Sequence, residues 1–229
     1  MSQAWWRDRF AEKQTELHAR PPRLIFLGDS IFHSFEWATP DAVWEHWYSG
    51  RDAVDLGFNS DDIDNVIWRV EHGEMDGISP RLAVILIGTN DLWRPAHEIV
   101  GKIATLVRAI HQRSPATRIL VLGILPSGRP EADIRNTHAV NAGLAARYGK
   151  PGAIATYLDV SCVFLHHGQL NTALFREYTI PGISAPLHPT LHGMDLLAAR
   201  IEPFVAAALG DTRRSTPGYP QETDCKAGG

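Results

Sequence analysis

Short apolar runs alternate with longer amphipathic segments along most of this chain, and this alternation constrains the fold more than any other feature. Runs of four to eight apolar residues that end at turn residues are typical of buried parallel strands. The runs are Arg23–Leu27, Ala53–Leu56, Leu82–Ile87, Arg118–Leu125 and Ala155–Val160. The sequence therefore predicts five strands.

The segments between these runs have the spacing of helices. In 61–74, the apolar residues Ile63, Val66, Ile67 and Val70 recur at helical intervals. Helices are also predicted over Ile99–Gln112, residues 131–148 and Gly193–Leu209, with a kink or break at Pro203 in the last one. Strands that alternate with helices predict a three-layer α/β/α fold around a central parallel five-stranded sheet.

The length and composition fit one such domain. The chain has 229 residues and a hydrophobic fraction of 44%, which is enough apolar material to cover both faces of a sheet. Residues 211–229 contain little apolar material and several prolines and glycines. We therefore predict a single domain over residues 1–210 and a disordered tail over 211–229.

Charge and hydropathy exclude several functions. The net charge is −4 without a basic cluster, which argues against a nucleic-acid-binding protein. No apolar run approaches the roughly 20 residues of a membrane span, and the first ten residues lack the apolar core of a signal peptide. We expect a cytoplasmic protein, or else the mature form of a secreted one. Cys162 and Cys225 lack metal-ligand spacing and are expected to be idle thiols rather than a disulfide.

Two polar motifs directly follow predicted strands. Gly28-Asp29-Ser30 follows the first strand, where a serine could act as a nucleophile at a helix start or, with Asp29, simply cap the helix. Asn90 in Gly88-Thr89-Asn90-Asp91 follows the third strand, where its amide could stabilise an oxyanion or close an Asx-turn. Because ligands bind beyond the carboxyl ends of parallel strands, Ser30, Gly57 and Asn90 are expected to share one site.

Position alone does not distinguish His188 among the eleven histidines. It lies in Pro186-Leu187-His188-Pro189-Thr190, shortly before the last predicted helix. No histidine pair has convincing metal-ligand spacing with nearby carboxylates, since His166 and His167 are adjacent. We expect no metal site and no organic cofactor.

The order of these motifs resembles the four sequence blocks of the SGNH (GDSL-like) hydrolases. Two longer stretches, GFNSDDIDNVIWRVEHGEMDGISPRLAVILIGTND and RILVLGILPSG, resemble the platelet-activating-factor acetylhydrolase catalytic subunits and related bacterial acetylesterases. The resemblance extends from about Trp6 to Leu209. It implies the flavodoxin-like SGNH hydrolase fold, and it makes a homodimer plausible.

The resemblance also implies a role for each motif residue. Ser30 would be the nucleophile and His188 the base that takes its proton and returns it to the leaving alcohol. The backbone N–H groups of Ser30 and Gly57 and the side-chain amide of Asn90 would form the oxyanion hole. Asp29 is expected to support the turn.

One position departs from the family pattern. An acidic residue stands three positions before the catalytic histidine in this family, whereas this chain has Ala185. Loss of the triad acid costs on the order of 10⁴ in rate. Three explanations compete: a substitution introduced to weaken turnover, which we favour, a working Ser-His dyad, or a natural pseudoenzyme. Asp195 lies in the last helix and is expected to point elsewhere.

The resemblance favours acetyl or other short acyl esters, with a small-molecule or glycan alcohol. Substrate contacts are predicted at Asp29, Phe58, Asn59, Trp93 and Leu187, whereas Trp68 is expected to pack in the core. The alternatives are a lysophospholipase or thioesterase of the same fold, or a non-catalytic module that binds its ligand through an intact oxyanion hole. Nucleotide binding is not expected, because no Gly-rich phosphate loop follows any predicted strand.

Overall fold

The computed structural model describes residues 4–37, 42–176, 185–215 and Cys225, and a parallel sheet forms its centre. The strands are β1 (Leu24–Gly28), β2 (Ala53–Gly57), β3 (Leu82–Leu86), β4 (Arg118–Leu122) and β5 (Thr156–Leu158), in the order β2-β1-β3-β4-β5. The five parallel strands confirm the predicted central sheet, and their order reverses beside β1, as in doubly wound folds.

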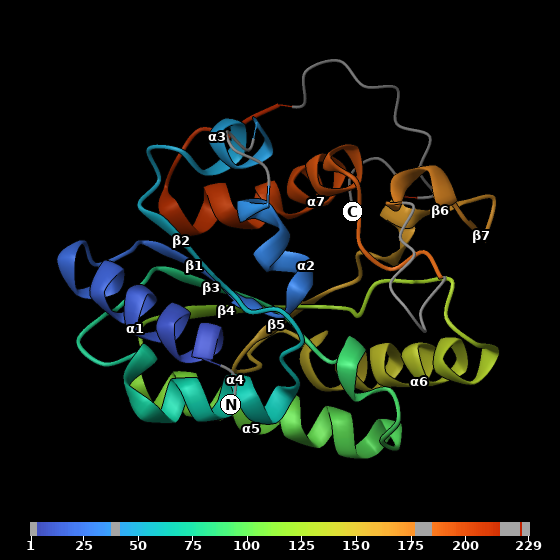
Figure 1. The fold of residues 1–229 in the computed structure, drawn as a ribbon, viewed down its shortest axis with the longest axis horizontal. Helices are drawn as coiled ribbons and strands as arrows, with labels where there is room; N and C mark the ends of the chain where they lie inside the picture. Colours follow the sequence, from blue (N-terminus) through green and yellow to red (C-terminus); the bar gives the residue numbers. More distant parts are fainter. Residues whose placement is uncertain (1–3, 38–41, 177–184, 216–224, 226–229) are drawn as a thin grey trace.

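Helices cover both faces of the sheet (Figure 1). They are α1 (Ala4–Ala19), α2 (Ser30–His33), α3 (Ala42–Tyr48), α4 (Ile63–Arg69), α5 (Ala96–Arg113), α6 (Glu131–Tyr148) and α7 (Leu191–Leu209). α2, α3 and α7 pack on one face, and α1, α4, α5 and α6 lie on the other. Two separate apolar cores result, one on each side of the sheet, as the predicted three-layer fold requires.

The last helix continues through a proline. Of the kink or break predicted at Pro203, the break does not occur, because α7 is one helix from Leu191 to Leu209. A proline inside a helix removes one hydrogen bond at a cost of about 3 kcal/mol. Leu197, Ile201 and Val205 are fully buried around Pro203, and burying an aliphatic side chain contributes about 1.5–3 kcal/mol each. The apolar face of α7 therefore outweighs the proline.

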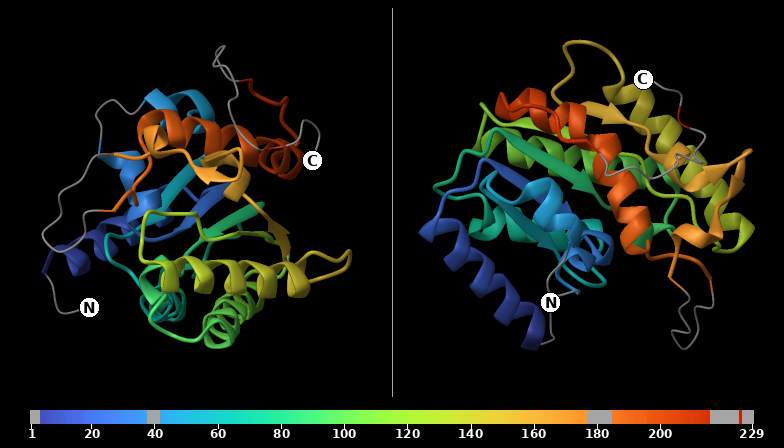
Figure 2. Two further views of the ribbon diagram at one scale, coloured as in Figure 1. Left: turned by 90° about the vertical axis from the view of Figure 1, so that its right-hand side faces the viewer. Right: turned by 90° about the horizontal axis from the view of Figure 1, so that it is seen from above.

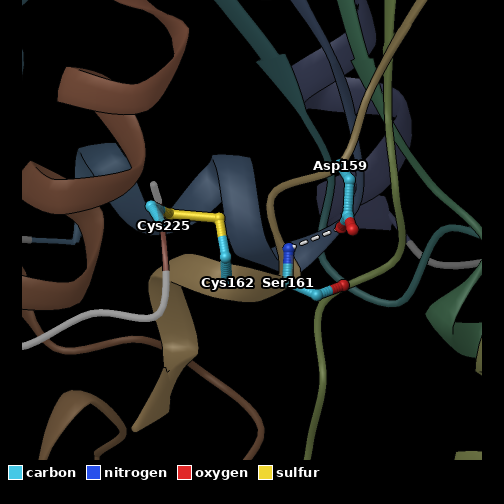
Figure 3. Close-up of a disulfide and its surroundings, with 4 residues drawn as sticks. All are labelled: Asp159, Ser161, Cys162 and Cys225. Atoms are coloured by element: carbon cyan, nitrogen blue, oxygen red, sulfur yellow. Dashed lines mark hydrogen bonds between the residues drawn. A yellow bond between two sulfur atoms is a disulfide. The ribbon is translucent and has the colours of Figure 1, made fainter. Parts of the chain in front are cut away.

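The chain after α7 is attached to the domain at two places within the segment 211–229 that was predicted to be a disordered tail. The backbone N–H of Arg214 donates to Glu202 in α7, and its guanidinium donates to the carbonyl oxygens of His46 and Ser49. Farther on, Cys225 forms a disulfide with Cys162 (Figure 3), which corrects our expectation of two idle thiols. The rest of the predicted tail, 216–224 and 226–229, lies outside the described residues.

Cys162 lies in a short segment after β5, beyond the edge of the sheet. Asp159 accepts a hydrogen bond from the backbone N–H of Ser161 and fixes the turn that leads to it. A small hairpin follows, formed by β6 (Leu165–His166) and β7 (Gln169–Leu170), and it projects from the body of the domain (Figure 2). Within the described residues, no helix is long and apolar enough to cross a membrane.

Candidate active site

Ser30 lies where β1 ends and α2 begins. Asp29 caps this helix, because its Oδ1 accepts a hydrogen bond of 2.9 Å from the backbone N–H of Ile31. Burial raises the pKa of Asp29 to about 7. A Cβ at Gly28 would lie 2.4 Å from the carbonyl oxygen of Leu86, so only glycine lets β1 turn this closely beside β3. Asp29 thus supports the turn that presents Ser30.

His188 meets Ser30 from a distant part of the chain. Its Nε2 lies 2.9 Å from Ser30 Oγ, across 158 residues of sequence. The histidine loop is fixed by backbone hydrogen bonds, from Arg176 N–H to the His188 carbonyl and from Thr190 N–H to the Leu174 carbonyl, each 2.8 Å. Burial, followed by the positive charges of Arg176 and Arg129, lowers the pKa of His188. The imidazole is therefore neutral at neutral pH and can accept the hydroxyl proton.

Asn90 lies beyond the end of β3. Gly88 has a φ of +118°, a conformation that favours glycine, and the short helical turn Thr89–Asp91 follows it. The Asn90 side chain donates one hydrogen bond, from Nδ2 to the carbonyl oxygen of Asp61 at 2.8 Å. A primary amide has two N–H groups, so this bond orients Asn90 and leaves a second donor.

The hydrogen bonding of Gly57 differs from the expectation that its backbone N–H belongs to the oxyanion hole. Its backbone N–H donates to Asp55 Oδ1 at 2.8 Å, and its carbonyl accepts from Arg9 Nε at 3.0 Å. A Cβ at Gly57 would lie 2.2 Å from the backbone nitrogen of His33. Gly57 therefore allows β2 to lie against α2, and in this structure its N–H is already used by Asp55 rather than free for a substrate oxyanion.

The turn after β2 offers a different donor. It is closed by a hydrogen bond from Asp61 N–H to the Phe58 carbonyl, and Ser60 within it has a φ of +65°. The Asn59 N–H donates to His33 Nδ1 at 3.2 Å, which holds the turn beside α2. Within the described part of the chain, the Ser60 N–H has no acceptor. Sequence reasoning missed Ser60, because a left-handed serine carries no sequence signal.

The other predicted substrate contacts lie in different environments. Phe58 is fully buried with the Arg69 guanidinium 4.0 Å from its ring centre, so it is a core residue and the predicted contact is corrected. Leu187 is buried beside His188, and Asn59 is half-buried in the turn. Trp93 is 74% exposed, with Arg94 stacked on it. Trp68 stacks against His72 and packs on Trp6, in keeping with the packing role expected for it.

Asp195 is the acidic residue considered as a replacement for the family acid at Ala185. Asp195 Oδ1 accepts a hydrogen bond of 2.6 Å from Trp47 Nε1 in the core, so it points elsewhere, as expected. Among the described residues, Arg176 and Arg129 are the charged groups that shift the pKa of His188. Among the described residues, no group of three or more His, Cys, Asp or Glu side chains is arranged to hold a metal ion.

Comparison with known proteins decides the family. A profile of the GDSL-like lipase/acylhydrolase family matches residues 26–196, which include Ser30, Asn90 and His188. The chain belongs to this family. The resemblance inferred from the sequence motifs is thereby confirmed, and the site described above lies within the matched region.

Relatives and solved structures agree with this assignment. The chain is 31% identical over 149 residues to the human "Platelet-activating factor acetylhydrolase IB subunit alpha1", a match that covers 64% of this chain and 62% of that subunit. A GDSL-like lipase from Bacteroides thetaiotaomicron superposes with a TM-score of 0.65 at 19% identity, covering 88% of this chain and 97% of the other. A carbohydrate esterase family 3 structure from Talaromyces cellulolyticus has a TM-score of 0.60 at 17% identity, covering 83% and 99%. These structures show the same fold.

Proposed function

We propose that this chain is a serine esterase that hydrolyses short-chain acyl esters, acetyl esters above all, through an acyl-serine intermediate. The contact of 2.9 Å between Ser30 Oγ and His188 Nε2 carries the proposal. His188 takes the hydroxyl proton as Oγ attacks the ester carbon, and it returns that proton to the leaving alcohol. In the second half of the reaction, His188 activates a water that releases the acid and regenerates Ser30.

The oxyanion hole is best supplied by groups other than Gly57. The backbone N–H groups of Ser30 and Ser60 lack acceptors within the described residues, and Asn90 retains a second amide N–H. The Asn90 amide is bonded to Asp61, the residue after Ser60, so both donors belong to one connected unit at the sheet edge. We propose Ser30, Ser60 and Asn90 as the donors to the oxyanion.

Ala185 lowers the turnover expected of this enzyme. When His188 takes the proton, the new imidazolium lies near Arg176 and Arg129, and the sequence has Ala185 at the position of the acid that stabilises it in this family. The backbone bonds of its loop still orient the ring. We therefore propose a Ser-His dyad whose turnover is weakened by the alanine, whether that residue is natural or was introduced.

The first test is hydrolysis of p-nitrophenyl acetate by the chain and by its Ala185→Asp, Ala185→Asn and Ser30→Ala variants. We expect Ala185→Asp to raise kcat by several orders of magnitude, up to about 10⁴-fold, because the carboxylate stabilises the imidazolium. Ala185→Asn adds similar bulk without charge and should gain far less, and Ser30→Ala should be inactive. Equal rates for alanine and aspartate would indicate a fully working dyad. Absence of hydrolysis by both would overturn the esterase proposal.

The preference for a short acyl chain is tested separately with p-nitrophenyl esters of increasing length. We expect kcat/KM to fall beyond short acyl groups. A profile that rises past about eight carbons would instead support a lysophospholipase or thioesterase. The human relative is named as an acetylhydrolase and a structural neighbour as a carbohydrate esterase, which supports acetyl esters of either small alcohols or glycans.

Ala185 also favours one alternative, a non-catalytic module that binds esters. An organophosphonate distinguishes the two, because only a serine activated by His188 reacts at an appreciable rate. Labelling at Ser30, located by peptide mass spectrometry, supports the esterase, and an inert Ser30 supports the binding module. A homodimer, expected from the family resemblance, is a further proposal that light scattering checks.

The disulfide gives an argument about the cellular compartment of the protein. Disulfides persist in oxidising compartments, so the Cys162–Cys225 pair supports an exported protein over the cytoplasmic one expected from the sequence.

A further inference from the structure

Two arginines on separate loops flank the candidate base. Arg176 follows the short segment that pairs with the histidine loop, where Phe175 bridges Pro189. The Arg176 backbone N–H donates to the carbonyl of His188, and its Nε donates to the carbonyl of Pro189 at 3.0 Å. The guanidinium is thus attached to the loop that carries His188, and its two terminal nitrogens remain for other partners.

A tryptophan links Arg176 to the histidine ring. The Arg176 guanidinium carbon lies 5.1 Å from the centre of the Trp37 ring. The His188 ring also lies beside Trp37, at 5.3 Å between ring centres. Stacking of this kind orients a guanidinium without neutralising it. Among the described residues, no carboxylate pairs with Arg176.

Arg129 reaches the same region from the loop after β4. The preceding residue, Gly128, donates its N–H to the carbonyl of Pro186 at 2.8 Å, and a Cβ there would lie 2.4 Å from the Pro186 ring. The Arg129 side chain is 18% exposed, and its Nε is buried without an acceptor. Its carboxylate contact, with Asp133, is long at 3.6 Å. A buried guanidinium N–H without an acceptor is costly, which points to a ligand that satisfies it.

We propose that Arg129 and Arg176 bind a carboxylate on the leaving alcohol of the ester, so that the substrate is an acyl ester of a hydroxy acid or sugar acid. This inference rests on the proposed esterase function. The leaving oxygen must lie beside His188 Nε2 to receive its proton, so the alcohol occupies the side of the site where the two arginines are attached. Two guanidinium groups in a half-buried site match a carboxylate, which accepts charge-assisted hydrogen bonds from both.

The acid nearest the nucleophile does not cancel this positive region. Asp29 accepts a hydrogen bond from the Ile31 N–H, and its burial, which raises its pKa to about 7, keeps part of the population protonated near neutral pH. Asp61 and Asp91, the carboxylates that act on Asp29, already pair with Arg69 and Arg94. Among the described residues, the charge near the leaving alcohol is therefore positive.

The test compares 4-acetoxybenzoate with 4-acetoxybenzamide, which release alcohols of similar shape with and without a carboxylate. We expect a higher kcat/KM for the benzoate ester, and we expect the ratio of the two values to fall about 10- to 100-fold in Arg129→Gln and Arg176→Gln. The ratio should recover in part in Arg176→Lys, which keeps the charge. Arg135→Gln, an exposed arginine on α6 paired with Glu131, is the matched control and should keep the ratio.

A ratio near one that neither variant changes would overturn the inference while leaving the esterase intact. If no ester is hydrolysed, the esterase proposal fails, and the carboxylate site is then tested by ligand binding alone. In that case, calorimetry with 4-hydroxybenzoate and 4-hydroxybenzamide should show tighter binding of the benzoate, lost in Arg129→Gln and weakened by salt. Equal binding of the two alcohols would contradict the anion site.

Discussion

The ionisation of His188 controls activity at the scale of single residues. Burial and the neighbouring Arg176 and Arg129 lower its pKa, so the neutral base persists below the usual histidine pKa of about 6.5. We expect the acid limb of kcat/KM against pH to lie below pH 6.5. Arg176→Gln removes one positive charge and should move that limb to higher pH, whereas Arg135→Gln should leave it in place. A limb that stays fixed in Arg176→Gln would show that Arg176 does not act on the imidazole.

Residue chemistry explains which parts of the site the sequence could predict. Ser30 and Asn90 follow apolar strands, and parallel strands bring their carboxyl ends to one edge, so their proximity follows from pattern alone. His188 needed the family resemblance, because eleven histidines are equivalent by composition. Gly57 could not be judged in advance. The side chain of Asp55, two residues earlier, takes its N–H, and such a local bond is not visible in the sequence.

At the scale of elements, the turn between β2 and α4 is held by a buried charge network. Arg69 pairs with Asp61 and Glu74 and also donates to the Leu56 carbonyl, while Trp6 donates to Asp61. Arg69→Met leaves two buried carboxylates without their cation, so we expect a loss of about 3–5 kcal/mol in the free energy of unfolding, measured in urea. Arg135→Met, the exposed control, should change it by about 0.5 kcal/mol or less. A loss in Arg69→Met no larger than the small loss expected for Arg135→Met would mean that the network does not stabilise the fold.

Helix α1 shows why some elements could not be predicted. Its buried residues, Trp6, Arg9, Lys13 and Leu17, have helical spacing, but two of the four are cations. Arg9 and Lys13 are buried because both pair with Glu36 near α2. An apolar pattern cannot reveal a helix whose packed face is partly ionic, since the stabilising partner is distant in sequence. The strands and the long helices α5, α6 and α7 bury mostly apolar faces and were predicted.

At the scale of the whole molecule, the predicted sheet and layers hold, and the main difference concerns the chain after α7. Its low apolar content indicated a tail that cannot bury enough surface to fold alone. Attachment comes instead from polar and covalent contacts, namely the hydrogen bonds of Arg214 and the bond between Cys162 and Cys225. Composition does not report such contacts, because each depends on where the fold places its partner.

The disulfide gives the last prediction. It closes a loop across 63 residues, and the chain-entropy relation assigns a loop of this length about 4 kcal/mol of stabilisation. We therefore expect the free energy of unfolding in urea to be lower in Cys225→Ser than in the oxidised unmodified chain, by up to that amount. The difference should be small when the unmodified chain has first been reduced. The site should stay intact, since the bond between Ser30 and His188 and the backbone bonds of the histidine loop do not involve the disulfide, so hydrolysis of p-nitrophenyl acetate below the unfolding transition should be unchanged. Two free thiols titrated in the unfolded, unreduced chain would contradict the pairing, because an intact bond leaves none.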